Sequence, residues 1–335
     1  MTSARREVLE VVSAAYRLDL ETSSWLDELV RAARPTLDRG RGLMSWSFRV
    51  SASGTHVFTS RIAATEDVTE AVIRSCTKNN DSLSQDEVAH AHANPRTLDT
   101  ASCAVDSLFG EGAFERWPKF DDARALGHAD CLVAKGCDPA GIGVMFAAPL
   151  PRVERVPRGD DRRWARVIAH VIAGLRLRAA GTPLGDGDAV LAPSGEVVHA
   201  EGQARGTSAR DALRAAAVRI DRARGSFGRA DPDGALEQWR ALVAGRWSLV
   251  DRFDSDGRRF LVARRNDPEV VGPTDLSARE RQVLAYAAQG HPNKYIAYVL
   301  GLAPSTVSTH LRRAMRRLGA RTRGDLAAIL APVER

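Results

Sequence analysis

Three consecutive segments near the C-terminus read SARERQVLAYAAQG (277–290), HPNKYIAYVLG (291–301) and LAPSTVSTHLRRAMRRLG (302–319). The first opens with a capping box, because the Ser277 hydroxyl can accept from the amide of Glu280 while the Glu280 carboxylate reaches back. Apolar residues then recur every three or four positions in each segment, which predicts three amphipathic helices. Their apolar stripes are Val283, Leu284 and Ala287, then Ile296, Ala297 and Leu300, then Val307, Leu311, Ala314, Met315 and Leu318.

Glycines and caps delimit these helices. We expect Gly290 and Pro292 to stop the first helix and Gly301 to turn the chain after the second. Ser305 is a good N-cap, so the third helix is expected to begin there and to run to about Leu318. Two helices joined by a tight glycine turn form a helix-turn-helix. A fourth helix is expected after a cap within 322–325, with the apolar residues Leu326, Ile329 and Leu330.

The polar faces of the expected helices carry groups that suit nucleic acid. Lys294 and Tyr298 lie off the apolar face of the second helix. The third helix turns hydroxyl and guanidinium groups away from its apolar stripe, and such groups can hydrogen-bond to phosphates and base edges in the major groove. These outward residues are Ser308, Thr309, Arg312, Arg313, Arg316 and Arg317.

Positive charge is concentrated in the same region. Residues 274–335 hold ten Lys and Arg against four Asp and Glu. Their balance of +6 equals the formal net charge of the whole chain, so the upstream residues are neutral overall. An excess of cations confined to one domain favours a surface that meets phosphates over a small helical bundle with solvated arginines.

The C-terminal residues resemble the LuxR/GerE-type four-helix DNA-binding domain over about a fifth of the chain. The resemblance rests on Leu276-Ser277-Ala278-Arg279-Glu280, Gly290, Asn293-Lys294, Ile296-Ala297, Leu300, Ser305-Thr306-Val307, His310, Leu318-Gly319 and Arg323. It implies that the helix over 305–318 enters the major groove and that the fourth helix supplies a dimer contact.

The resemblance also assigns roles to single residues. Ser308, Thr309 and Arg312 fall at positions that reach bases, and Lys294 and Thr306 at positions that hold phosphate. With the outward face, the DNA-binding candidates are Lys294, Ser305, Thr306, Ser308, Thr309, Arg312, Arg313 and Arg316. Two residues depart from the family pattern. Tyr295 replaces a usual acidic residue, which we interpret as a surface change, and Ser308 replaces a common basic one, which leaves base preference open.

Composition places the chain among globular proteins. Its 335 residues suggest two or three domains, and 44% hydrophobic with 27% charged residues is enough to build buried cores. No apolar run approaches the roughly twenty residues that span a bilayer. The N-terminal residues also lack a signal-peptide core. We therefore expect a cytoplasmic protein without membrane contact.

The cysteines and histidines predict no metal site. Four cysteines, Cys76, Cys103, Cys131 and Cys137, are too few and too scattered for a disulfide scaffold, so reduced thiols are expected. The pair His90 and His92, and His128 with Cys131 and Cys137, lack the paired close spacing of zinc ligands. The sequence leaves open whether the chain binds a cofactor.

Upstream, residues 1–182 mix helical and strand patterns. Helical periodicity covers 8–16, 25–33 and 66–78, with Pro35 closing or following the second of these helices. Two strand pairs are expected, at 43–50 with 56–62 and at 131–135 with 142–147. The stretch 79–119 is polar and irregular, with short helices expected around 86–92 and 107–116. This order of elements resembles a GAF-like sensory domain.

A second upstream block spans 186–266 and resembles a small PAS-like domain. It begins with a hairpin over 189–200, continues with helices over 208–224 and 234–243, and closes with strands at 247–253 and 259–264. Linkers are expected at 181–187 and 266–273. The predicted fold is multidomain, with an α+β sensory region (GAF-like, 1–182, then PAS-like, 186–266) followed by an all-α helix-turn-helix domain over 274–335.

A long helix over 160–180 joins the two upstream blocks. Its apolar stripe, which is Trp164, Val167, Ile168, Val171, Ile172 and Leu175, is wider than packing on one small sheet requires. We expect a partner copy to bury the excess, so that this helix forms a dimer interface and transmits a signal to the DNA-binding domain.

These patterns favour a one-component transcription regulator. It would bind double-stranded DNA as a homodimer, respond to a small-molecule effector or partner, and act on RNA polymerase. An enzyme is not indicated, since Ser75-Cys76-Thr77-Lys78 lacks the companion motifs of Ser-x-x-Lys chemistry. Two alternatives remain open. They are a response regulator, although residues 1–60 hold no cluster of acids, and an acyl-homoserine-lactone receptor, although Trp46, Asp130 and Trp164 form no obvious pocket pattern.

Overall fold

A computed structural model describes residues 3–50, 56–88, 96–181, 187–270 and 275–326. Its first part is built on an antiparallel sheet of order β2-β1-β6-β5-β4, in which the short strand β3 pairs with the first two residues of β1. The strands are β1 (Met44–Val50), β2 (His56–Phe58), β3 (Ala63–Ala64), β4 (Leu98–Thr100), β5 (Asp130–Cys137) and β6 (Ile142–Leu150). Both expected strand pairs are present, whereas β4 was not anticipated.

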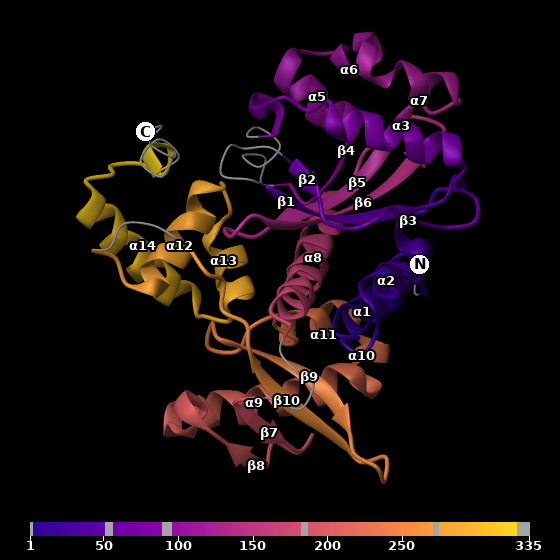
Figure 1. Ribbon diagram of the computed structural model, residues 1–335. Helices are drawn as coiled ribbons and strands as arrows, with labels where there is room; N and C mark the ends of the chain where they lie inside the picture. The colour runs from indigo at the N-terminus through magenta and orange to yellow at the C-terminus, as the bar shows by residue number, and fades with distance from the viewer. Residues whose placement is uncertain (1–2, 51–55, 89–95, 182–186, 271–274, 327–335) are drawn as a thin grey trace.

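Helices cover both faces of this sheet (Figure 1). One face packs against α1 (Ser3–Ala15), α2 (Thr22–Leu37) and α8 (Arg158–Ala179). The other carries α3 (Glu70–Asp81), α5 (Ala101–Phe109), α6 (Ala113–Arg116), the 3-10 turn Pro118–Phe120 and α7 (Asp121–Ala125). The helix α2 passes through Pro35 before it ends, since proline removes only one hydrogen bond from its last turn.

The polar stretch before β5 is more regular than its composition suggested. The Thr100 hydroxyl accepts from the amide of Cys103 and caps α5, which therefore starts well before the expected 107–116. Gly110 and Gly112, at φ 92° and 72°, then break it from α6. Of the helix expected near 86–92, residues 85–88 are helical and the rest falls outside the described residues.

A second antiparallel sheet follows, of order β8-β7-β10-β9. Its strands are β7 (Ala189–Leu191), β8 (Val197–Ala200), β9 (Trp247–Phe253) and β10 (Arg259–Arg265), and both hairpins match the prediction. The connection holds the 3-10 turn Gly202–Arg205, α9 (Thr207–Arg224), α10 (Ser226–Ala230) and α11 (Pro232–Gln238). The helix expected over 234–243 ends earlier, at Gln238. The carbonyls of Leu236 and Trp239 accept hydrogen bonds from side chains instead, and the chain turns toward β9.

The C-terminal part consists of α12 (Ala278–Ala288), α13 (Asn293–Leu300) and α14 (Pro304–Leu318). The predicted capping box is confirmed, with the Glu280 amide donating to Ser277 Oγ at 3.3 Å and the Ser277 amide donating to Glu280 Oε2 at 3.0 Å. Ser305 is not the N-cap of α14. Pro304 takes the first helical position, where its fixed φ fits and its missing N–H is not needed. The fourth helix is described only at residues 324–326.

The helix α8 lies at the centre of the molecule, with the first sheet on one side and the rest of the chain on the other (Figure 1). Trp164, Ile172 and Leu175 are buried, and Val167, Ile168 and Val171 are 0% exposed within the single chain. The prediction that a partner copy buries this stripe is therefore wrong. The excess apolar width is covered by α1, α11 and α13, elements that periodicity alone could not bring to this helix.

Four further expectations concern the cysteines, metal sites, membrane-spanning helices and linkers. All four cysteines are free thiols. No group of three His, Cys, Asp or Glu side chains that could hold a metal ion occurs in the described ranges, from which His90 and His92 are missing. No helix in those ranges is long and apolar enough to cross a bilayer. The expected linkers fall partly outside the description, which leaves out residues 182–186 of the first and 271–273 of the second.

Candidate nucleic-acid interface and its contacts with the rest of the chain

The outward face of α14 carries an arginine surface. Arg312, Arg313 and Arg316 are exposed, while Val307, Leu311 and Ala314 are buried on the opposite side. The expected division of this helix into an apolar and a cationic face is thus present. Arg317, also expected to face outward, is exposed too, but its guanidinium is engaged, since it donates to Glu280 Oε2 at 2.8 Å and to the Asp275 carbonyl at 3.1 Å.

Two hydroxyls of α14 are partly engaged. Ser308 donates to the Pro304 carbonyl and accepts from Asn293 Nδ2, each at 3.0 Å. Thr309 donates to the Ser305 carbonyl at 3.0 Å. A hydroxyl has one donor and two acceptor positions, so Ser308 keeps one acceptor position and Thr309 keeps two. Both side chains can therefore accept a further hydrogen bond but have no proton left to donate.

The remaining candidates lie near the helix starts. Lys294 is exposed in the first turn of α13, Ser305 is exposed, and Thr306 is half-buried at the start of α14. Arg323 fixes the start of α13, because its guanidinium donates to the His291 carbonyl at 3.0 Å and to Asn293 Oδ1. The structure thus places all eight candidates on α13 and α14, with six of them exposed.

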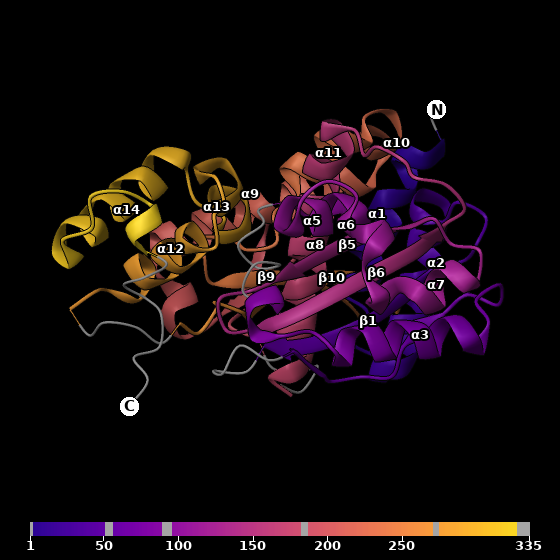
Figure 2. The same cartoon turned by 90° about the horizontal axis from the view of Figure 1, so that it is seen from above.

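The opposite side of this helical unit is docked on the rest of the chain, with α13 closest to it (Figure 2). Tyr298, expected off the buried face of α13, is only 7% exposed. Its hydroxyl lies 2.8 Å from each of the carbonyl oxygens of Leu236 and Trp239. A buried hydroxyl needs a hydrogen-bond partner, and here the upstream region supplies it.

Backbone groups complete the docking. Arg279 donates to the carbonyls of Gly245 at 2.9 Å and Ala244 at 3.3 Å, and Arg240 donates to the Leu302 carbonyl at 3.0 Å. Gly301 has φ 62°, and a Cβ atom there would lie 2.0 Å from the Leu242 carbonyl oxygen. Gly301 therefore serves both the turn of the helix-turn-helix and close contact with the upstream backbone.

A row of buried hydrogen bonds runs from the turn after α1 through α8 to α13, and we call its members Tyr16, His170 and Tyr298 the α1–α13 chain. Tyr16 Oη lies 2.9 Å from His170 Nδ1, and His170 Nε2 lies 2.8 Å from the Trp239 carbonyl and 3.0 Å from Tyr298 Oη. Because a carbonyl only accepts, Nε2 carries the proton and Tyr16 donates to Nδ1. Burial lowers the pKa of His170 to about 3, so the ring is neutral.

A second polar cluster joins the same regions. Arg176 of α8 donates to Asp138 Oδ2 at 3.1 Å and to Asn266 Oδ1 at 3.2 Å. Asn266 in turn donates to the Ala173 carbonyl and to Ser248 Oγ, each at 2.8 Å. Arg176 and Asp138 are 8% and 1% exposed, so this ion pair has little contact with water. It fixes the start of the final linker against α8.

An apolar cavity of about 240 Å³ lies between the first sheet and its outer helices. Trp46 of β1 and Asp130 of β5 both line it, whereas Trp164 of α8 is buried beside Phe146 in the core on the opposite face of the sheet. The sequence had suggested no pocket for these three residues, and two of them share one. Asp130 accepts from the Ser102 amide at 3.0 Å and hydroxyl at 2.5 Å, and its burial raises the pKa of the carboxyl.

Sequence reasoning missed the docking residues, of which Tyr298 and His170 matter most. Both stand inside apolar helical runs, IAYVL and RVIAHVIAGL. A polar group within such a run signals a buried hydrogen bond, since burying it without a partner is costly. The partners themselves could not be read from the sequence, because Trp239 and Tyr16 come from distant segments. Tyr295, interpreted as a surface change, is half-buried with its ring 4.4 Å from that of His291.

Comparison with known proteins agrees with the geometry of the C-terminal part. Residues 274–330 match the family described as "GerE: Bacterial regulatory proteins, luxR family". These residues form a helix-turn-helix domain of the LuxR family.

The similar proteins are regulators. The HTH-type transcriptional activator RamA of Corynebacterium glutamicum is 52% identical over 110 residues, covering 28% of this chain and 39% of that protein. The nitrate/nitrite response regulator protein NarP of Escherichia coli is 37% identical over 94 residues, covering 28% of this chain and 42% of that protein. The matches thus span about two fifths of each of these relatives. Escherichia coli SdiA aligns with 93% of this chain and 92% of its own, at 12% identity and a TM-score of 0.34, a level that carries no inference.

Proposed function

We propose that the chain is a one-component transcription regulator that binds a specific double-stranded DNA site through α14. The observation that supports this most is the arginine surface of α14, which stays exposed while the other side of the LuxR-family domain is docked. Arg312, Arg313 and Arg316 form no ion pair with any described part of the chain. They are therefore available to an external polyanion.

The eight candidates divide by the contacts that they can make. Arg312 and Thr309 lie on the outward face and would read base edges, while Arg313, Arg316 and Lys294 would hold phosphates, together with Ser305 and Thr306. Ser308 and Thr309 have only acceptor positions left. They would therefore favour the amino groups of adenine and cytosine, which are the hydrogen-bond donors of the major groove.

The test is a selection experiment with the full chain. A pool of random duplexes is equilibrated with the protein, and bound duplexes are sequenced over several rounds. We expect one enriched motif and an affinity that falls steeply as salt rises, because phosphate contacts release counterions. A Lys294→Ala variant should weaken binding to all sequences alike, whereas Arg155→Ala, an exposed arginine before α8, is the matched control. A pool without enrichment after repeated rounds contradicts the proposal.

The upstream region would sense a ligand. The bounds 1–182 (GAF-like) and 186–266 (PAS-like) remain part of this proposal, supported by one antiparallel sheet in each block. The apolar cavity of the first block would accept a small apolar effector. Since Trp46 and Asp130 line it, an acyl-homoserine-lactone receptor is the second candidate function.

Ligand-dependent thermal unfolding separates these two sensing candidates. Acyl homoserine lactones that raise the melting temperature more than fatty acids of equal chain length would support the receptor, because Asp130 and Trp46 would then recognise the polar ring. Equal shifts with both compounds would support a general apolar effector. A melting temperature that no apolar compound changes would contradict ligand sensing in this cavity.

The active form would be a cytoplasmic homodimer that acts on RNA polymerase. Two recognition helices reach successive turns of the major groove only if they lie about 34–36 Å apart, which one protomer cannot provide. With α8 buried, the fourth helix is the remaining candidate for the dimer contact. Light scattering of the chain with its selected duplex decides the point, and a complex with one protomer per duplex would contradict it.

A further inference from the structure

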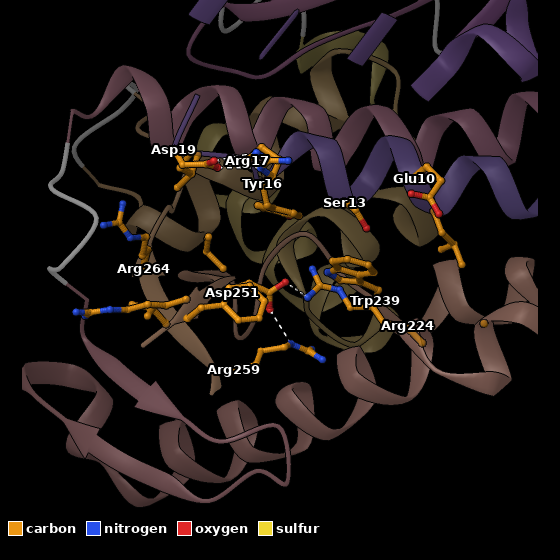
Figure 3. Close-up of a pocket in the computed structure, with 18 of the residues that line it drawn as sticks. Glu10, Ser13, Tyr16, Arg17, Asp19, Arg224, Trp239, Asp251, Arg259 and Arg264 are labelled. Carbon is orange, nitrogen blue, oxygen red and sulfur yellow. Dashed lines mark hydrogen bonds and ion pairs between the residues drawn. The ribbon is translucent and has the colours of Figure 1, made fainter. Parts of the chain in front are cut away.

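We infer that a second cavity, formed between α1 and the β9–β10 side of the second sheet, binds a small organic anion, and that this ligand acts on the LuxR-family domain through the α1–α13 chain. The regulatory half of the inference rests on the proposed function, whereas the binding half does not. The cavity has a volume of about 1130 Å³, far larger than the apolar one. Figure 3 shows its walls, with Tyr16 and Asp19 from the turn after α1 facing Arg224, Asp251 and Arg259 across the opening.

The walls of this cavity carry an excess of positive charge. Six arginines line it, against the three acidic residues Glu10, Asp19 and Asp251. The arginines are Arg17, Arg224, Arg229, Arg252, Arg259 and Arg264. A concave surface lined mainly by one sign of charge concentrates counter-ions of the opposite sign, so the site selects anions.

Asp19 pairs with Arg17, whereas Arg224 and Arg259 keep donors that the acids on the wall do not satisfy. Arg224 and Arg259 share the single carboxylate of Asp251, and Arg259 also donates to Asp221 at 2.9 Å. Arg224 Nε and Arg259 Nη2 are nevertheless buried without a hydrogen-bond partner in the described residues. A buried donor left unpaired is unfavourable, and the oxygen atoms of a carboxylate or phosphate would pair with it.

The same wall also offers an apolar platform. The Arg224 guanidinium lies 4.3 Å from the centre of the Trp239 ring, and the Tyr16 ring stacks on Trp239 at 6.2 Å between centres. Val250 and Val262 of the strands extend this surface. The ligand class is therefore an organic anion, in which a carboxylate or phosphate meets the arginines and an apolar or aromatic body covers the rings.

The cavity wall is connected to the DNA-binding domain. Tyr16 lines the cavity through its ring, while its hydroxyl donates to His170, which reaches the carbonyl of Trp239 and the hydroxyl of Tyr298. A ligand that moves α1 or Trp239 must therefore disturb hydrogen bonds that hold α13. Because all three members of the α1–α13 chain are buried, water does not replace a bond that is lost.

Calorimetric titration of the full chain tests the binding half. Inorganic phosphate, benzoate and a nucleoside monophosphate are the probes, and they separate a bare anion from an aromatic carboxylate and a phosphate ester. We expect an organic anion to bind more tightly than phosphate alone.

Affinity for the anion should fall as salt rises, and the double substitution Arg229→Ala with Arg252→Ala should weaken it by roughly tenfold or more. Both side chains are exposed, so folding is preserved. Arg258→Ala, an exposed arginine of the same hairpin that does not line the cavity, should change nothing.

The absence of binding by all three probes, or equal affinity in the double variant and the wild type, overturns the site. Coupling is tested with Tyr298→Phe, which removes the last hydroxyl of the α1–α13 chain at a residue that does not line the cavity. This variant should bind the anion as the wild type does, yet lose the anion-dependent change in affinity for the selected duplex. If Tyr298→Phe keeps that change, or if the wild type shows none, the coupling is overturned while the site stands. A protein that binds anions but no duplex contradicts the proposed function alone.

Discussion

At the scale of single residues, Tyr298 shows how one hydroxyl holds the LuxR-family domain to the rest of the chain. Its oxygen lies within 3.0 Å of two carbonyl oxygens and of the His170 ring, all contributed by upstream elements. Burial raises the pKa of the phenol well above its ordinary value of 10, so the hydroxyl keeps its proton and remains a donor.

Tyr298→Phe should lower the free energy of unfolding by about 1–2 kcal/mol, since it leaves two buried carbonyls without this donor. Urea denaturation followed by circular dichroism measures the change. Tyr295→Phe is the matched control on the same helix, because that hydroxyl forms no hydrogen bond with the described residues. Equal losses in the two variants would mean that the Tyr298 contact contributes nothing to docking.

His170 makes stability depend on pH. Its pKa is about 3 in the folded chain against 6.5 for an ordinary histidine, so only the unfolded chain takes up a proton as the pH falls below 6.5. Stability is therefore fully present above pH 6.5 and should decline by up to about 1.4 kcal/mol per pH unit below it. We expect His170→Gln to reduce the slope between pH 6.5 and 5 without abolishing it, because burial also lowers the pKa of His291 to about 4 and gives a second contribution of the same sign. The exposed His199→Gln serves as control, and an unchanged slope in His170→Gln would contradict this account.

At the scale of elements, the sequence predicts what local rules determine. The capping box of α12, the turn at Gly301 and the cationic face of α14 were all expected and are all present, because each depends on residues a few positions apart. Long-range contacts were not accessible. The sequence predicted the wide apolar stripe of α8, but the elements that cover it, α1, α11 and α13, come from distant segments. A dimer was therefore inferred where the chain packs on itself.

Gly301→Ala tests the docking of α13 as an element. Two effects should add, namely the strain of an L-residue at φ 62° and the clash of its Cβ with the Leu242 carbonyl. Gly319→Ala is a matched control, since Gly319 has φ 68° with no atom within 4 Å of the added Cβ. We expect Gly301→Ala to cost clearly more free energy of unfolding, by about 1–3 kcal/mol beyond the control. Equal costs would show that this turn does not rest on the upstream backbone.

At the scale of the whole molecule, the buried core continues from the first sheet through α8 to the second sheet and α13. The helix α8 contacts the first sheet, α1, α11 and α13, so it is the element through which an upstream change would reach the DNA-binding domain. Transmission would thus occur within one chain. Such coupling requires that the upstream ligand favour one arrangement of α13 over another.

Val171→Glu distinguishes this arrangement from an α8 dimer. Val171 is 0% exposed in the single chain, so a carboxylate there would be buried without a partner. We expect loss of the cooperative unfolding transition or a destabilisation of several kcal/mol, as measured by circular dichroism. A variant that stays fully stable and merely becomes a monomer by light scattering would show that α8 faces a partner.

The central claim is that α14 reads DNA sequence, and competition titration of Arg312→Ala tests it most directly. Affinity is measured for the selected duplex and for a scrambled duplex of equal length, at one salt concentration. The account predicts that Arg312→Ala loses about 1–3 kcal/mol on the selected duplex and much less on the scrambled one, so the specificity ratio collapses. Arg155→Ala should leave both affinities unchanged. A specificity ratio that is the same in Arg312→Ala and in the wild type would contradict the account.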